Sequence, residues 1–200
     1  MSDKIIHIRE GLFNTKPLRS GDGYTFTLVS RLSDMLFEAE ALFGERDKVW
    51  TILGVEIYME GEFPQNWYPG GNERKHIVFQ LISPADIDEV SANYQLAHEV
   101  IHSLSPKIGT EANVLEEGVA TWFAKYYVKK NFNVLRGEGR ESYKNAREKV
   151  EKLLVVDENA IKKLRAVEPC FKKMTVDTFE RAGLFHDKEL IGELLTSFNR

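Results

Sequence analysis

Three residues of the segment His98-Glu99-Val100-Ile101-His102 have the types and the spacing needed to bind and use a metal ion. Residues i and i+4 of a helix lie on one face, one turn apart, so both imidazoles can reach the same ion. Zinc favours such nitrogen ligands, and a glutamate next to the first ligand points near the open coordination position, where it can take a proton from water. The segment therefore predicts a zinc site with Glu99 as the general base.

A catalytic zinc site needs a third protein ligand, because it holds three protein groups and keeps one position for water. Downstream of His102 the chain reads Leu115-Glu116-Glu117-Gly118-Val119-Ala120, near the start of another expected helix. If that helix returns antiparallel to the first, it brings a carboxylate back to the metal. We expect Glu117 to be the third ligand, with Glu116 as the alternative.

Apolar periodicity predicts the elements that must position these residues. It favours a helix over 26–43, strands over 49–59 and 76–82, the histidine-bearing helix over 91–103 and a further helix from 113 to about 130. The apolar, β-branched character of 49–59 predicts a buried strand. Residues 61–72 are rich in Pro, Gly and aromatics and predict a long loop placed to overhang a cleft, its aromatics either walling the cleft or packing within the loop.

The start of the helix at Asn113 shows a capping-box pattern, since Glu116 follows three residues on. Beyond residue 137, helices are expected over about 141–155 and 158–167, with a terminal pair between 176 and 198. We expect an α+β fold with a small mixed sheet and an active-site helix. Its catalytic domain would span 1–135, and a helical extension over 136–200 would pack on the same core.

Composition narrows the classes of partner. The chain is 42% hydrophobic and 29% charged, with a formal net charge of -4 and a pI near 5.8, so it lacks the positive excess that nucleic acid requires. The basic stretches 125–130, 144–152 and 162–165 are expected to be solvated helix faces, and in 144–152 acidic residues alternate with the basic ones. No nucleic acid partner is expected.

The single cysteine and the length of the apolar stretches bear on the compartment in which the protein resides. Cys170 is the single cysteine, cannot form an internal disulfide, and is expected to be a half-buried structural thiol. No stretch has the apolar length of a spanning helix or of an export signal. We expect a cytoplasmic protein without a membrane partner.

The two motifs together resemble the Glu-ligated zincins, or gluzincins, the clan of zinc metallopeptidases that includes thermolysin-like enzymes and the membrane alanyl aminopeptidases. Many of these enzymes place their third ligand in a Glu-Gly-small-Ala segment downstream of HExxH, which Glu117-Gly118-Val119-Ala120 matches. The resemblance covers about residues 49–130. It implies a zincin-like domain, His98, His102 and Glu117 as zinc ligands, and Glu99 as the base.

The resemblance also implies an edge strand over 76–82, along which an extended substrate aligns. One departure is Thr121, which stands one turn past Glu117 where several of these enzymes carry an acidic residue that orients a ligand histidine. No aminopeptidase exopeptidase motif precedes the histidines.

We therefore expect hydrolysis of a peptide or amide bond in a peptide or protein substrate, with Zn²⁺ polarising the carbonyl and Glu99 moving the proton. The alternative is a non-catalytic binding or regulatory protein built on a zincin scaffold. A donor to the oxyanion is also needed. The candidates that the sequence offers are Tyr68, His76, Tyr94, Tyr127 and Tyr143.

Overall fold

The structure, a computed structural model of the chain, describes residues 11–18, 23–137, 139–185 and 187–200. Within these residues it is an α+β fold of eight α-helices and one mixed three-stranded sheet, so the fold class expected at that level is confirmed. The strands are β1 (Thr51–Ile57), β2 (Gln65–Trp67) and β3 (His76–Leu81). The helices are α1 (Leu28–Phe43), α2 (Gly71–Arg74), α3 (Glu89–His102), α4 (Val114–Phe132), α5 (Glu141–Val156), α6 (Ala160–Val167), α7 (Val176–Arg181) and α8 (Lys188–Leu194).

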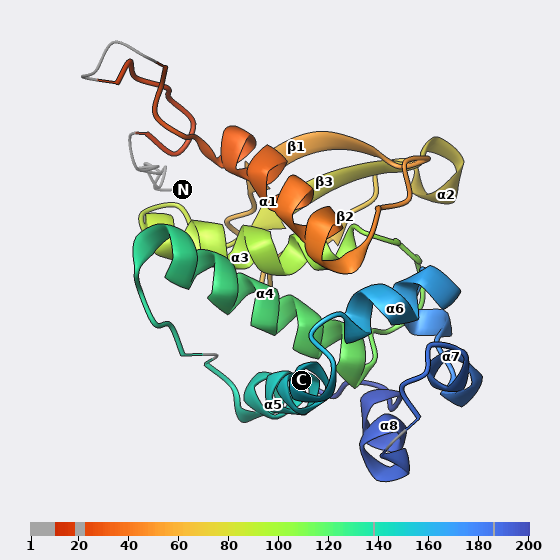
Figure 1. Ribbon diagram of the computed structural model, residues 1–200. Coiled ribbons are helices and arrows are strands. Elements are labelled where there is room, and N and C mark those ends of the chain that lie inside the picture. The colour runs from red at the N-terminus through yellow and green to blue at the C-terminus, as the bar shows by residue number, and fades with distance from the viewer. Residues whose placement is uncertain (1–10, 19–22, 138, 186) are drawn as a thin grey trace.

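The elements form layers in which α3 is central. The sheet and α1 pack on one side of α3, and α4 packs on its other side (Figure 1). α5 and α8 pack against α4, and α6 contacts both α5 and α1. One buried apolar cluster includes residues of the sheet, of α3 and α4 and of the C-terminal helices. Buried apolar residues of α5 to α8 thus belong to the same cluster as those of the sheet, α3 and α4.

The sheet differs from the expectation in its strand order, which is β1-β3-β2. β3 pairs with β1 in parallel and with β2 antiparallel, so the prediction that 76–82 is an edge strand is wrong. The edge near the histidines is β2, which lies within the stretch 61–72 expected to be a loop. The three residues of β2 are too few to show the alternation of a strand, which is why the apolar pattern did not predict this strand.

β1 also differs, because it was expected to be buried. Its residues alternate between exposed and half-buried, and Leu53 is 53% exposed. β1 lies at an edge with one strand neighbour, so part of its apolar surface stays in contact with solvent. The fully covered strand is β3, whose residues 77–81 are all buried.

Local hydrogen bonds fix where α3 and α4 begin. The Asp88 side chain accepts from the backbone N–H groups of Val90 and Ser91 at the start of α3. The Asn113 side chain accepts from the N–H of Glu116 at the start of α4. The expected N-cap at Asn113 is therefore confirmed, but the reciprocal half of the capping box is wrong, since the Glu116 carboxylate bonds to His102 instead.

A bidentate contact holds α3 against the end of β3. The Gln95 side chain accepts from Ile82 N–H at 2.9 Å and donates to the Ile82 carbonyl at 3.1 Å. Asn66 of β2 donates from Nδ2 to the backbone carbonyl of Glu99 at 3.0 Å. These bonds fix the central and edge strands relative to the turn of α3 that carries the motif.

The C-terminal segment returns to the start of α4. Val114 N–H donates to the Thr196 carbonyl at 3.0 Å, and Phe198 N–H donates to the Ala112 carbonyl at 2.9 Å. Residues 196–200 thereby lie beside the motif helix pair, and Arg200 reaches its cavities.

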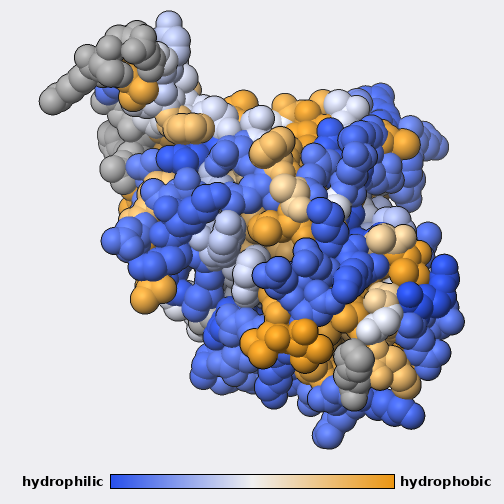
Figure 2. All heavy atoms as spheres, viewed as in Figure 1, coloured by the Kyte–Doolittle hydropathy of each residue, from blue (hydrophilic) through white to orange (hydrophobic). Residues whose placement is uncertain are grey.

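Figure 2 shows one face of the molecule, which is mostly hydrophilic with apolar side chains exposed in separate groups. Among the described residues, no helix combines the length and apolar character required to cross a bilayer.

Cys170 is buried, with Sγ 3.8 Å from the Ser105 carbonyl, as a structural thiol was expected to be. The prediction that 162–165 is a solvated helix face is wrong for Arg165, which is only 4% exposed.

Candidate metal centre

Three potential ligand atoms from α3 and α4 converge on one point. His98 Nε2 lies 3.3 Å from His102 Nε2 and 3.1 Å from Glu117 Oε2. His102 Nε2 lies 3.8 Å from the same Glu117 oxygen. The structure thus brings together all three residues predicted as ligands, in a group that could hold a metal ion.

The separations of these atoms fit a tetrahedral zinc ion. Zinc bonds of about 2.0–2.2 Å at tetrahedral angles place neighbouring ligand atoms roughly 3.3–3.6 Å apart. The three distances between His98, His102 and Glu117, 3.1, 3.3 and 3.8 Å, bracket that range. Two imidazole nitrogens and one carboxylate oxygen are also the donor set of known catalytic zinc sites.

The third residue of the HExxH segment, Glu99, lies beside this group. Its side chain is 5% exposed and borders cavities on both sides of the site. Burial raises the pKa of the Glu99 carboxyl above its usual value, while His102 and His98 act in the opposite direction. A carboxylate whose pKa is moved toward neutrality is suited to accept a proton and release it again.

Glu116 has a role that the sequence reading did not assign. Its Oε1 lies 2.8 Å from His102 Nδ1, the ring nitrogen on the opposite side from the converging Nε2. Such a bond fixes the tautomer and orientation of a ligand histidine and raises its basicity. Glu116 therefore supplies the orienting carboxylate missing at Thr121, which is buried with a hydroxyl that has no hydrogen-bond partner among the described residues.

The electrostatics of the group favour an ionised carboxylate beside the imidazoles. Burial alone would raise the pKa of Glu117, but the charges of His102 and His98 and the hydrogen bond with His98 lower it to about 2. Burial alone would lower the pKa of His102, but Glu117 and the hydrogen-bonded Glu116 raise it to about 9. A cation is thus favoured at this point, as a proton or as a metal ion.

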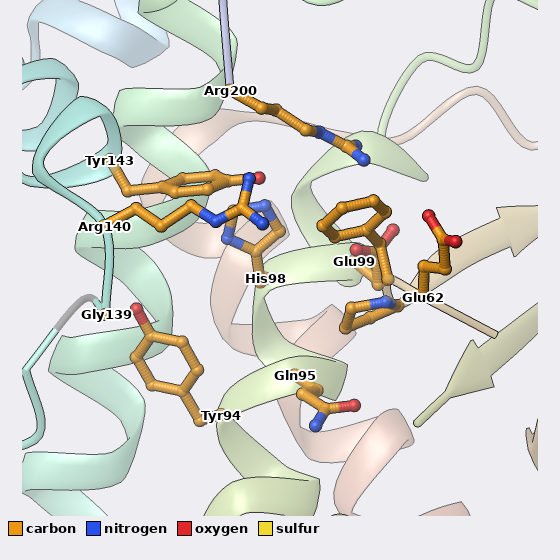
Figure 3. A pocket seen from close by; sticks show the side chains of 11 residues that line it. Glu62, Tyr94, Gln95, His98, Glu99, Gly139, Arg140, Tyr143 and Arg200 are labelled. Carbon is orange, nitrogen blue, oxygen red and sulfur yellow. The ribbon is translucent and has the colours of Figure 1, made fainter. Parts of the chain in front are cut away.

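Two of the cavities that border the site adjoin each other. One, of about 400 Å³, lies on the His98 side, and Figure 3 shows its lining side chains. The other, of about 220 Å³, lies on the side of His102 and Glu117. Pro64, Glu99 and Arg200 line both, so the two cavities meet at the predicted base. The stretch 61–72 does border the cleft, as expected.

The five candidate oxyanion donors differ in whether they line the cavities. Tyr68, Tyr94 and Tyr143 line the cavities. Tyr127 does not, since its hydroxyl is held by Asp34 at 2.6 Å, and His76 lies at the start of β3 outside both linings. Of the aromatics in 61–72, Phe63 and Tyr68 line the cleft, whereas Trp67 does not.

Two arginines of the cleft, Arg140 and Arg200, were missed from the sequence. Arg140 precedes α5 and Arg200 lies in the segment after α8. Neither belongs to a motif or to an apolar period, so only the tertiary structure places them at the site.

Comparison of the chain with family models, with curated proteins and with solved structures found no match. The group that could hold a metal ion is thus described from its geometry. The resemblance to the gluzincins stays a prediction.

Proposed function

We propose that this chain is a zinc-dependent hydrolase of peptide or amide bonds, with a zincin-like catalytic domain. The observation that carries the proposal is the convergence of His98 Nε2, His102 Nε2 and Glu117 Oε2 beside the buried carboxylate of Glu99. A structural zinc site has four protein ligands, whereas this group offers three and borders a cleft. That difference favours catalysis over a purely structural ion.

The residues have separable roles. When bound by His98, His102 and Glu117, zinc supplies Lewis acidity to the substrate carbonyl and lowers the pKa of a water molecule. The Glu99 carboxylate accepts a proton from the attacking water and passes it to the nitrogen of the departing amine, so it ends the cycle ionised. Glu116 holds the His102 ring in place.

The substrate is proposed to lie along β2. The side of β2 away from β3 has no strand partner among the described residues, and it adjoins the cavities. An extended peptide can add to such an edge through backbone hydrogen bonds. Asn66 ties this strand to the carbonyl of Glu99 at 3.0 Å, which sets the distance between the bound peptide and the base.

Oxyanion stabilisation is assigned to the tyrosines of the cleft. The ring of Tyr143 packs edge-on against His98 with centroids 5.7 Å apart, and Tyr68 lines the opposite cavity. A phenol on either side of Glu99 can donate to the developing negative charge.

The experiment that tests the proposal combines metal content with turnover. Protein prepared without chelator or affinity-tag metal is analysed for bound elements, alongside the His98→Ala variant and a control, His76→Ala, which lies outside the group. About one zinc per chain is expected in the wild type and in the control, and none in His98→Ala.

Turnover is then measured on a peptide library with the wild type, Glu99→Gln and the surface control Glu73→Gln. Glu99→Gln is expected to retain zinc and lose cleavage, because the amide cannot accept the proton. Bound zinc with no cleavage by the wild type would contradict the hydrolase and favour the non-catalytic binding function. Normal cleavage by Glu99→Gln would contradict the role of the base.

A further inference from the structure

We infer that the cavity on the His98 side binds a carboxylate of the substrate between Arg140 and Arg200. The inference rests on the proposed function, since it places this carboxylate on the molecule that is cleaved, and it names a substrate class: peptides with an acidic side chain or a free terminal carboxylate next to the scissile bond.

The first observation is the placement of the two guanidinium groups. Arg140 and Arg200 both line the cavity of about 400 Å³ that contains His98 and Glu99. Their Cζ atoms lie 5.1 and 4.8 Å from the centroid of the same Phe63 ring. In Figure 3 Arg200 extends across the cavity near Glu99, and Arg140 lies alongside Tyr143 near His98.

The second observation concerns counter-charges. Within the described ranges, no ion pair joins Arg140 or Arg200 to a carboxylate, although Glu62 and Glu99 line the same cavity. Burial acts to raise the pKa of the Glu99 and Glu117 carboxyls, and the charge of Arg200 does act on both at longer range to lower it. Glu62 is exposed, and Glu99 is buried beside the imidazoles. The guanidinium groups of Arg140 and Arg200 contact the same Phe63 ring and repel each other. An anion bound between them offsets that repulsion.

The opposite cavity differs in this respect. Its lysine, Lys172, donates to the backbone carbonyls of Thr110 at 2.7 Å and Lys107 at 3.3 Å. Glu111 and Glu117 also line it. Arg200 lines this cavity too, but Lys172 is occupied by backbone carbonyls and the lining is acidic. Of the two cavities, the one on the His98 side has both arginines, so the asymmetry favours that side for the substrate carboxylate.

The chemistry of the lining fits a carboxylate better than a phosphate or an apolar group alone. A guanidinium presents a planar fork that matches the two oxygens of a carboxylate. Phe63, Tyr94 and Tyr143 supply apolar faces for the aliphatic part of an acidic side chain. Glu62 and Glu99 disfavour a group of higher negative charge.

Binding is tested without turnover, in zinc-loaded Glu99→Gln protein. Two proteome-derived peptide libraries serve as probes, one with free carboxylates and one with every carboxyl group amidated, and retained peptides are identified after ultrafiltration. We expect acidic peptides to be retained about tenfold above their amidated counterparts. Adding Arg140→Gln or Arg200→Gln should remove most of this preference, whereas Arg181→Gln, a surface control on α7, should not.

The positions of the carboxylates distinguish their sources. An acidic residue at a fixed distance inside the retained and cleaved peptides indicates side-chain recognition, and enrichment tied to the free C-terminus indicates the terminal carboxylate. Retention that ignores carboxylates, or that neither arginine variant changes, would overturn the inference. Carboxylate-selective retention that depends on both arginines, by a wild type that cleaves nothing, would uphold the carboxylate site while contradicting the proposed hydrolase and the substrate class, so the two failures are distinct.

Discussion

At the residue scale, two adjacent glutamates of one helix have different roles. Glu117 meets the Nε2 atoms of both histidines, whereas Glu116 meets Nδ1 of His102. Consecutive helical residues point in directions about 100° apart, so the rotation of α4 about its axis decides which of them faces the point between the two Nε2 atoms. The sequence predicted Glu117 through its motif, but Glu116 also fitted a helix cap, and periodicity does not fix that rotation.

The orienting role of Glu116 predicts a loss of affinity without a loss of ligands. Glu116→Ala should weaken zinc binding by about 10- to 100-fold, because the ring of His102 loses its fixed tautomer. Glu116→Gln keeps an acceptor and should recover part of the loss. Competition with a chromophoric chelator measures the affinity, with Glu168→Gln as a control outside the group. Unchanged affinity in Glu116→Ala would show that this bond does not orient a ligand.

The raised pKa of His102 predicts a pH dependence of zinc uptake. A pKa near 9 means that this imidazole is protonated at neutral pH in the zinc-free protein, so zinc must displace a proton. Affinity should therefore rise with pH and level off above about pH 9, while Glu117, whose pKa is lowered to about 2, contributes no proton in this range. Titration calorimetry in buffers of different ionisation enthalpy measures the protons released. No release between pH 6 and 8 would contradict the arrangement.

At the element scale, the long helices followed their apolar periods, whereas the strand expected at the edge of the sheet, 76–82, lies at its centre. The end of α3 could be placed because Pro106 and Gly109 follow the histidines, and the start of α4 because Asn113 caps it. Strand order depends on which edges meet in three dimensions, and a strand as short as β2 has no detectable period. Both errors concern pairing, which lies beyond local sequence.

Gly118, in the motif itself, has a packing role at the crossing of α4 and α5. A Cβ there would lie 2.5 Å from the Ala146 carbonyl oxygen and 2.6 Å from Val150 Cγ2. Gly118→Ala gains about 1 kcal/mol of helix propensity, but overpacking against backbone costs about 1–3 kcal/mol. We expect a net loss of up to about 2 kcal/mol and a displaced site helix.

Urea denaturation measures the stability of this variant. Gly192→Ala in α8 is the matched control, since a Cβ there meets nothing within 4 Å, and it should be neutral or stabilising. Equal effects of the two substitutions would mean that the crossing has room to adjust.

At the scale of the whole molecule, buried contacts join the two parts that the sequence divided at residue 135. The guanidinium of Arg165, in α6, donates to the carbonyls of Phe43, Gly44 and Glu45 at the end of α1 at 2.9, 2.6 and 3.0 Å. A positive charge at a helix C-terminus is favourable, and here it satisfies carbonyls that the helix leaves unpaired. The basic stretch 162–165 gave no indication of this, because a buried and a solvated arginine look alike in sequence.

Loss of this contact should destabilise the molecule as a whole. Arg165→Leu leaves the buried Phe43 carbonyl and the partly buried carbonyls of Gly44 and Glu45 without this donor, and we expect a loss of about 3 kcal/mol. The midpoint of urea unfolding reports it, with Arg181→Leu on the surface as the control. A change below about 0.5 kcal/mol, the range of surface substitutions, would contradict the role assigned to Arg165.

The most direct test of the central claim, that His98, His102 and Glu117 hold zinc, is the X-ray absorption spectrum of the zinc-loaded protein. The account predicts four-coordinate zinc with two imidazole nitrogens and oxygen donors at about 2.0–2.2 Å, and a different spectrum or no zinc in Glu117→Ala. A sulfur ligand at about 2.3 Å, which only Cys170 or a methionine could supply, or an all-oxygen shell that Glu117→Ala leaves unchanged, would contradict it.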